Sequence, residues 1–430
     1  MKRRLEQQLK SWHDSSSARR PLLINGARQS GKTWLLKEFA QTCYEGYVHV
    51  SLDVEKRVAS YFDESISPQR IVQLLEAEYR QKIVPGKTLL ILDEIQSCER
   101  ALTSLKYFAE DAPEYHVAAA GSLLGVAINR ERYSFPVGKV QTHTLFSLDF
   151  EEYLWAMGDT QLADDIKLAF ATMKPLVAGQ HDKAISRYRE YLAVGGMPAA
   201  VAAFINSGSV LDSAAVHQEI MDNYTADMAK YASETEAVKI RACYNSLPAQ
   251  LAKDNHKFQY KVVRNGGTAT IFGAALEWLE LAGVIFKNQM IEQGTQPLPV
   301  HADLSAFRLY MSDTGLLCSK SGVRASDVLS GGLHHFQGAL AENYVAQQLA
   351  ARGYQLFYWS SGNTAEVDYV VQSQSGVSAV EVKSGLNTHS KSLNQFTERY
   401  SPYRSIRLSL KPFGDGGKIR AVPLYAAFCI

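Results

Sequence analysis

The chain has 430 residues, of which 46% are hydrophobic and 21% charged, and its formal net charge is +1. This length exceeds what one ordinary core organises, so the composition predicts a soluble globular protein of about two to three domains. The near-neutral charge excludes a global basic field for nucleic acid, although a local basic patch stays open.

No targeting or membrane-spanning segment is indicated. The basic residues Lys2–Arg4 are not followed by the apolar run of a secretory signal. The longest uncharged apolar stretch, Tyr191–Ile205, is too short to cross a bilayer. The cysteines include no C-x-x-C pair, which argues against a disulfide framework or a zinc site. We therefore expect a cytoplasmic protein without membrane contact.

The first predicted strand, residues 21–25, leads into a phosphate-binding pattern. Residues 26–33 read GARQSGKT and fit G-x-x-x-x-G-K-[ST], and the apolar residues of 34–40 follow with helical spacing. A strand, a glycine-bounded turn and a helix start direct several N–H groups and a helix dipole at one point, which suits nucleotide phosphates. Lys32 is expected to reach the β- and γ-phosphates of ATP, and Thr33 to bind Mg²⁺. The predicted nucleotide-binding residues are Gly26, Ala27, Arg28, Gln29, Ser30, Gly31, Lys32, Thr33, Trp34 and Asp93.

A second pattern follows about sixty residues later. Residues 87–96 contain four consecutive apolar residues that end in Asp93 and Glu94, which predicts a buried strand with carboxylates at its tip. Asp93 is expected to hold Mg²⁺ and its water shell, and Glu94 to activate the attacking water.

Further strands at 47–53, 116–120 and 140–146, with helices at 1–12 and 71–79, complete the first domain. This alternation predicts an α/β fold with a parallel sheet and the ligand at the carboxyl ends of its strands. In ATPases with a second acid after the buried strand, a strand between the two motif strands ends in a polar residue that senses the γ-phosphate. Ser122 is the candidate for this sensor, and a simple turn serine is the alternative.

Several segments in this order resemble a known family. RPLLINGARQSGKTWLLKEFA, LLILDEIQ, AAAGSLLGVA and SFPVGKVQTHTLFSLDFEEYL, followed by YLAVGGMPAAV and LYMSDTGLL, resemble AAA-type P-loop ATPases of bacteria and archaea that carry a C-terminal nuclease-like domain. The resemblance implies ATP hydrolysis. Lys139 departs from it, because an arginine is expected after the glycine. Arg130 and Arg132 are candidates for an arginine finger, and hydrolysis that depends on an oligomer stays open.

The middle of the chain is helix-rich. Residues 156–235 predict a helical linker or lid without a catalytic pattern. In residues 236–325, helices at 238–251, 260–263 and 269–282 precede strands at 284–286 and 307–313, which is typical of a winged helix. The helix that would enter a DNA groove carries Glu277 and Glu280 but no cation, and only Lys257, Lys261 and Arg264 lie nearby. A packing module is therefore favoured over a DNA-binding one.

The last segment, residues 326–430, predicts a second site. Residues 366–371 and 378–383 alternate as strands, and a turn centred between Gln374 and Ser375 puts Asp368 opposite Glu381, with Lys383 on the same face. Glu342 points inward from a helix at 338–349. This pattern resembles the PD-(D/E)XK nuclease fold, a restriction-endonuclease-like α/β domain. The resemblance implies that Asp368 and Glu381 hold Mg²⁺, that Glu342 assists and that Lys383 positions or activates water. A non-cutting scaffold and a chance pair of charged strands are the alternatives.

Two functions remain open at this point. The first is Mg²⁺-dependent ATP hydrolysis coupled to the binding or processing of DNA or another nucleic acid, which the set of Asp368, Glu381 and Lys383 favours. The second is an ATP-driven signalling or defence switch whose winged-helix and nuclease-like domains bind a protein partner without cutting, which the near-neutral charge favours. The predicted domains are 1–155, 156–235, 236–325 and 326–430.

Overall fold

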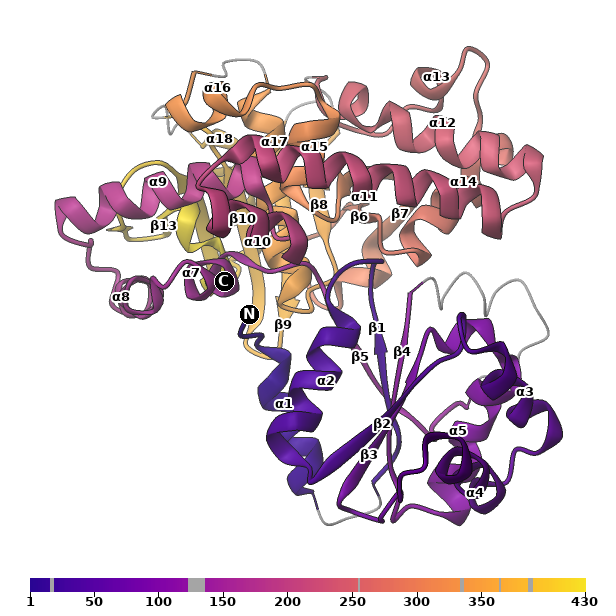
Figure 1. Cartoon of the computed structure of the whole chain (residues 1–430). Helices are drawn as coiled ribbons and strands as arrows, with labels where there is room; N and C mark the ends of the chain where they lie inside the picture. Colours follow the sequence, from indigo (N-terminus) through magenta and orange to yellow (C-terminus); the bar gives the residue numbers. More distant parts are fainter. Residues whose placement is uncertain (16–18, 123–135, 254–255, 333–335, 363–364, 386–389) are drawn as a thin grey trace. The chain divides into compact units, whose positions relative to one another are not determined.

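The computed structural model describes the chain apart from residues 16–18, 123–135, 254–255, 333–335, 363–364 and 386–389, and its described part divides into two compact units (Figure 1). The N-terminal unit comprises Lys2–Phe146 and Leu281–Gly283. The C-terminal unit comprises Met1, Ser147–Glu280 and Val284–Ile430. The finer division into four domains stays a prediction, since the structure separates the chain at the coarser level of two units.

A parallel sheet organises the N-terminal unit. Over the described residues it has five strands in the order β2-β3-β4-β1-β5, and all neighbouring strands are parallel. The strands are β1 (Leu22–Asn25), β2 (Gly46–Ser51), β3 (Thr88–Asp93), β4 (His116–Gly121) and β5 (Gln141–Thr144). Both β3 and β4 are buried along their whole length, as their apolar runs require. The strand before Ser122 lies between the two motif strands, as predicted from the sequence.

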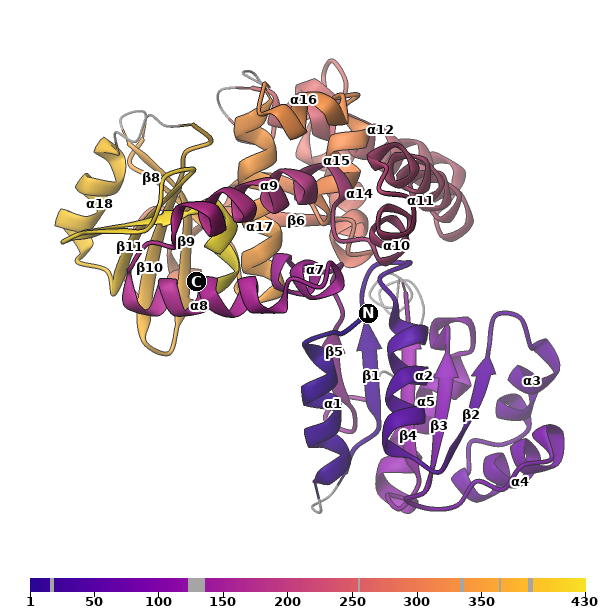
Figure 2. The same ribbon diagram turned by 60° about the vertical axis from the view of Figure 1, so that its left-hand side comes forward.

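Helices cover both faces of this sheet (Figure 2). α1 (Leu5–Asp14) and α2 (Lys32–Cys43) share one apolar cluster with β1, β3 and β4, which includes Leu89 and Ile91. α3 (Lys56–Glu64), α4 (Pro68–Tyr79) and α5 (Glu99–Asp111) share a second cluster, which includes Leu90 and Leu92. Successive side chains of β3 thus serve opposite faces. A short 3₁₀ helix, η1 (Ile95–Ser97), follows β3.

Helices make up the first part of the C-terminal unit. They are α7 (Phe150–Ala156), α8 (Thr160–Thr172), α9 (Ala178–Val194), α10 (Pro198–Ser207), α11 (Val210–Tyr231), α12 (Glu234–Leu251), α13 (Tyr260–Val263) and α14 (Ala269–Leu281). Later helices are α15 (Thr314–Lys320), α16 (Ala325–Ser330), α17 (Gln337–Ala351) and α18 (Lys391–Tyr400), with 3₁₀ turns η2 (Leu298–His301) and η3 (Leu424–Cys429). In the part of the chain that the structure describes, no helix combines the length and apolar character needed to cross a membrane.

A mixed sheet follows these helices. Its eight strands, counted over the described residues, run in the order β12-β13-β11-β10-β9-β8-β6-β7. They are β6 (Ile285–Ile291), β7 (Ala302–Met311), β8 (Phe357–Ser360), β9 (Glu366–Ser373), β10 (Gly376–Val382), β11 (Arg404–Ser409), β12 (Gly414–Gly416) and β13 (Ile419–Pro423). The β6–β7 hairpin matches the strands predicted as a wing, but β6 also pairs in parallel with β8. The hairpin therefore extends this sheet, and the predicted boundary at residue 325 does not separate two sheets.

The β9–β10 hairpin has the predicted register. A two-residue turn joins Ser373 to Gly376, and pairing continues to Tyr369 opposite Val380, which brings Asp368 opposite Glu381. On its other side β9 departs from strict alternation. Phe357 of β8 pairs with Val370 and Trp359 with Val367, so one β8 residue faces two β9 residues in a β-bulge. Because of this bulge, Val367 and Val370 join the same apolar cluster.

The GGMP and SDTG motifs have a structural role. Asp313 Oδ2 accepts a hydrogen bond from the Gly196 N–H (2.7 Å), and Asp313 Oδ1 caps α15 by accepting from the Leu316 N–H (3.1 Å). The Leu148 N–H in turn donates to the Gly196 carbonyl (2.7 Å). These bonds satisfy a fully buried carboxylate and tie three distant chain segments together.

Candidate functional site

The P-loop connects β1 to α2 in a conformation that a side chain would block at its first position. Gly26 has φ +147°, and a Cβ added there would lie 2.2 Å from the backbone carbonyl oxygen of Leu145. Gln29 also lies in the left-handed region, at φ +64°. α2 begins at Lys32 without a side-chain hydrogen bond to its first turn. Its amino end therefore offers N–H groups and a helix dipole to an anion, as the motif predicts.

Lys32 lies over the loop. Its Nζ donates to the carbonyl oxygens of Gly26 (3.0 Å) and Ala27 (2.8 Å). Burial lowers the pKa of Lys32 to about 8, while the nearby Glu94 and Asp93 carboxylates oppose this shift. A phosphate that replaces the two carbonyl groups would hold the ammonium charged. Trp34, in the same first turn of α2, has 43% of its surface exposed.

Thr33 and Asp93 meet across the carboxyl edge of the sheet. Thr33 Oγ1 donates to Asp93 Oδ2 (2.7 Å), and His49 Nε2 of β2 lies 3.2 Å from the same oxygen. Burial alone would raise the pKa of Asp93, but the hydrogen bonds from His49 and Thr33 outweigh it and lower that pKa. A hydroxyl and an ionised carboxylate are hard oxygen ligands, so these residues fit Mg²⁺.

Glu94 follows Asp93 with a strained backbone. Its φ is +50°, in the left-handed region that non-glycine residues rarely adopt. The conformation brings its carboxylate Oε2 to Ser122 Oγ, which donates at 3.0 Å, and to the amide of Gln96, which also donates. Such strain persists where the surroundings impose it and is frequent in active sites. Ser122 therefore lies against Glu94, the predicted water-activating residue.

Three residues at this site escaped sequence reasoning. Arg3 is buried, and its Nη1 donates to the P-loop carbonyl of Ser30 (3.0 Å) while its Nη2 donates to the Phe146 carbonyl (2.5 Å). His49 lies on the strand beside β3 and Gln96 two residues beyond Glu94. Strand order could have suggested His49, whereas no local pattern marks Arg3. Arg130 and Arg132 lie outside the described residues.

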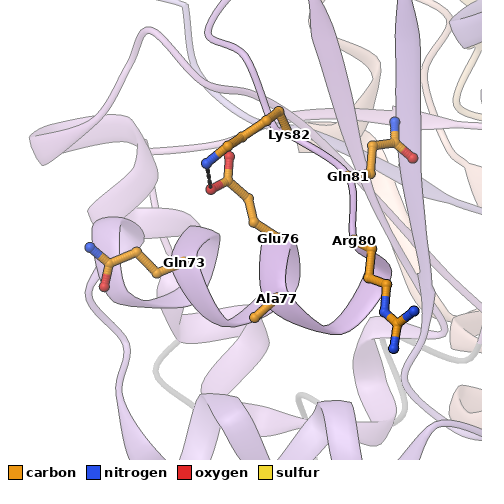
Figure 3. Close-up of a pocket in the computed structure, with 6 residues that line it drawn as sticks. All are labelled: Gln73, Glu76, Ala77, Arg80, Gln81 and Lys82. Atoms are coloured by element: carbon orange, nitrogen blue, oxygen red, sulfur yellow. Dashed lines mark hydrogen bonds and ion pairs between the residues drawn. The ribbon is translucent and has the colours of Figure 1, made fainter.

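A separate pocket of about 350 Å³ lies elsewhere in the N-terminal unit (Figure 3). Its lining, around the end of α4, includes Glu76 and Lys82, which form an ion pair at 2.9 Å. It adjoins the segment that leads into the amino end of β3, whereas Asp93 ends that strand. The pocket therefore contains none of the predicted site residues.

The C-terminal unit brings together the predicted nuclease-like residues. Asp368 Oδ2 accepts from the Val382 N–H (2.8 Å), and Lys383 Nζ pairs with Glu381 Oε1 (2.6 Å). Burial and the neighbouring Glu342 raise the pKa of Asp368 to about 7. Glu342 itself is buried on α17, as its position among apolar residues predicts.

Residues from the middle of the chain complete this cluster. Glu342 Oε2 accepts from Tyr310 Oη (2.9 Å) and pairs with His256 Nδ1 (2.8 Å). The Arg308 guanidinium lies 3.4 Å from Asp368 Oδ1 and 3.8 Å from Glu342 Oε2. An arginine among the apolar residues of 307–311 was the available signal for Arg308. Arg308 and Asp368 are 60 residues apart in the sequence, so no local pattern indicated their contact.

These contacts do not fit the Mg²⁺ site that the resemblance implies. Divalent cations bind carboxylate oxygens, but here Arg308 pairs with Asp368 Oδ1 and Lys383 pairs with Glu381 Oε1. Across the described ranges, no group of three or more His, Cys, Asp or Glu side chains is arranged to hold a metal ion. The metal-binding role of Asp368 and Glu381 therefore stays a sequence prediction that this geometry does not favour.

The helices predicted as a DNA-binding module keep a mixed surface. Lys257, Lys261 and Arg264 are exposed before α14, while Glu277 and Glu280 are exposed on α14 itself. Phosphate contacts need cations, so DNA binding through α14 stays a prediction without support from its charge.

Three family models match separate parts of the chain. Residues 18–154 match an AAA domain. Residues 185–327 and 337–426 match two families, each described as a domain of unknown function (DUF8612 and DUF4143). No curated protein matches the chain at a significant level.

Solved structures resemble the chain loosely. The Walker-type ATPase PABY2304 of Pyrococcus abyssi is 14% identical, with 74% of this chain and 95% of that chain covered and a TM-score of 0.43. The ORC2 protein of Aeropyrum pernix is 12% identical, with coverages of 77% and 95% and a TM-score of 0.41. AMPPCP-bound DnaA of Aquifex aeolicus is 13% identical, with coverages of 64% and 85% and a TM-score of 0.28. Likenesses at this level do not bear on activity or binding. The family match and the P-loop geometry agree that residues 18–154 form an AAA-type P-loop ATPase domain.

Proposed function

We propose that the N-terminal unit binds ATP with Mg²⁺ at the P-loop and hydrolyses it with Glu94 as the general base. The observation that carries this proposal is the meeting of Thr33 and Asp93 at 2.7 Å, with Glu94 at the next position. A P-loop hydroxyl, a Mg²⁺-binding carboxylate and a base are the parts that phosphoryl transfer to water requires.

Each side chain then has a defined role. Lys32 leaves the carbonyl groups of Gly26 and Ala27 to bind the β- and γ-phosphates. Thr33 and Asp93 would hold Mg²⁺, which neutralises phosphate charge. Glu94 takes a proton from a water while the water oxygen bonds to the γ-phosphorus, and the bond from that phosphorus to the β,γ-bridging oxygen breaks to release ADP. Ser122 and Gln96 both bond to Glu94 Oε2 and so fix the orientation of the base.

Nucleotide binding tests the first half of this proposal. Fluorescent ATP titrated in Mg²⁺ should bind the wild type, and Lys32→Ala should weaken binding by about tenfold or more, because charged hydrogen bonds to phosphate are worth about 1.5–3 kcal/mol. Lys37→Ala, on the same helix and outside the P-loop, is the matched control and should bind like the wild type. A wild type that does not bind ATP would contradict the proposal.

We further propose that ATP turnover acts on a partner of the C-terminal unit. The Asp368, Glu381 and Lys383 pattern and the winged-helix element order support a nucleic acid. The acidic α14 surface and the near-neutral net charge support a protein. A rise in ATP turnover on addition of duplex DNA would support the nucleic acid, and its absence would support the protein partner.

A further inference from the structure

The carboxylate cluster of the C-terminal unit already contains a fixed cation. Arg308 of β7 is 2% exposed. Its Nη1 lies 3.4 Å from Asp368 Oδ1 and 3.8 Å from Glu342 Oε2, and its Nη2 pairs with Glu366. One guanidinium thus contacts Asp368 and Glu342, two of the three carboxylates that the nuclease-like pattern assigns to metal chemistry.

Packing holds this guanidinium in place. It lies over the ring of Tyr358, 4.5 Å from the ring centroid, in a cation–π contact. β7, which carries Arg308, is paired with β6 in the same sheet as β9. Arginine stays charged in proteins and is the side chain best suited to buried pairs with carboxylates. Removing it from the cluster would require the sheet edge to open.

Further groups of the chain bind these carboxylates. Glu342 Oε2 receives Tyr310 Oη and His256 Nδ1, and Asp368 Oδ2 receives the Val382 N–H. Lys383 pairs with Glu381 Oε1, while Glu381 Oε2 is buried without a hydrogen-bond partner. Three carboxylates, those of Glu342, Asp368 and Glu381, therefore face Arg308, Lys383 and His256. A divalent cation added to this group would meet the positive charges of Arg308 and Lys383 at short range.

We infer that Arg308 takes the place of the divalent cation in this cluster, so that the C-terminal unit does not take Mg²⁺ there and does not cut phosphodiesters by a metal-dependent route. The nuclease-like pattern of Asp368, Glu381 and Lys383 then serves to hold β7 and the segment around His256 onto α17 and β9. The inference is independent of ATP hydrolysis and concerns the C-terminal unit alone.

Mn²⁺ binding to the full chain tests this inference. All proteins carry Asp93→Asn, so that the P-loop contributes no cation site, and Mn²⁺ is titrated by electron paramagnetic resonance without nucleotide. The chain with Arg308 and its Asp368→Asn version should bind Mn²⁺ identically. Loss of a Mn²⁺ site on Asp368→Asn would overturn the inference.

The converse change should open the site. Arg308→Gln should add one Mn²⁺ per chain, and Glu381→Gln in the same chain should remove it again. Arg404→Gln is the matched control, because Arg404 begins β11 of the same sheet and lies over the rings of Phe170 and Tyr403 instead of the cluster. A folded Arg308→Gln chain without the added site would overturn the inference. If Arg308→Gln does not fold, the inference is tested by Mn²⁺ binding to the chain with Arg308 and to its Asp368→Asn version.

Discussion

At the scale of single residues, burial shifts the pKa values of polar side chains in both units. His116 of β4 is an example away from the P-loop. Its Nδ1 lies 2.8 Å from Tyr44 Oη, and its Nε2 faces the Arg19 guanidinium. Because arginine only donates, Nε2 must accept, so the ring is neutral with its proton on Nδ1. Burial, reinforced by Arg19, lowers the pKa of His116 to about 4.

This shift predicts a pH-dependent stability of the N-terminal unit. The unfolded chain protonates His116 near its ordinary pKa of 6.5, whereas the folded protein resists protonation down to about 4. The stability that His116 contributes is therefore present above pH 6.5 and is lost as the pH falls toward 4, by an amount on the order of 3 kcal/mol. Urea unfolding of the wild type and His116→Gln at several pH values checks this. Parallel pH profiles for the two proteins would refute it.

Residue contacts were predictable only where they follow from local patterns. The two-residue turn after Ser373 sets the β9–β10 register, so the approach of Asp368 to Glu381 followed from the sequence. The P-loop residues followed from their motif for the same reason. Arg308 and His256 reach Glu342 and Asp368 from other segments, and such contacts carry no local signature. Arg3 at the P-loop belongs to the same class.

At the scale of elements, hydrogen bonds to the backbone connect segments that no sequence pattern links to one another. Hydrogen bonds connect Leu148, Gly196 and Asp313, which precede α7, α10 and α15. We call this junction of three residues the hub. A Cβ on Gly196 would lie 2.0 Å from the Leu148 carbonyl oxygen, which accepts a hydrogen bond from Tyr191 Oη.

Replacing this glycine should therefore break the hub. Gly196→Ala is expected to destabilise the C-terminal unit by about 3 kcal/mol or more, because overpacking against backbone cannot relax through a side chain. Gly273→Ala is the matched control, since a Cβ there meets nothing within 4 Å inside α14. It should stabilise the helix by about 0.5–1 kcal/mol. Denaturant unfolding followed by circular dichroism compares the two, and equal effects would show that the hub tolerates a methyl group.

Most elements of the N-terminal unit were predicted, because their apolar periodicity is local, whereas in the C-terminal unit the predicted ranges cover α12 to α14, α17, β6, β7, β9 and β10. Strands β1 to β5 and helices α12 to α14 lie close to the predicted ranges. The pairing of β6 with β8 was not predictable, since a hairpin after three helices reads equally well as a wing or as part of a larger sheet. The bulge in β9 was also not predicted, although three consecutive apolar residues, 369–371, interrupt the alternation beside it.

At the scale of the whole molecule, one unit contains the P-loop, and the other contains a cluster of carboxylates that pair with Arg308, Lys383 and His256. The nucleotide site is built at the carboxyl edge of a parallel sheet, where Lys32, Asp93 and Ser122 belong to or follow different elements. The C-terminal cluster joins chain segments that the sequence reads as separate domains. We therefore expect ATP hydrolysis from the N-terminal unit and the binding of a partner from the C-terminal unit.

The central claim is that this chain hydrolyses ATP through Glu94. Steady-state phosphate release by the wild type and by Glu94→Gln, in Mg²⁺ and with ATP binding measured in parallel, tests it most directly. Loss of a general base should lower turnover by about 100-fold or more, while the neutral isostere leaves ATP binding intact. Turnover in Glu94→Gln equal to that of the wild type, or a wild type that binds ATP without hydrolysing it, would contradict the claim.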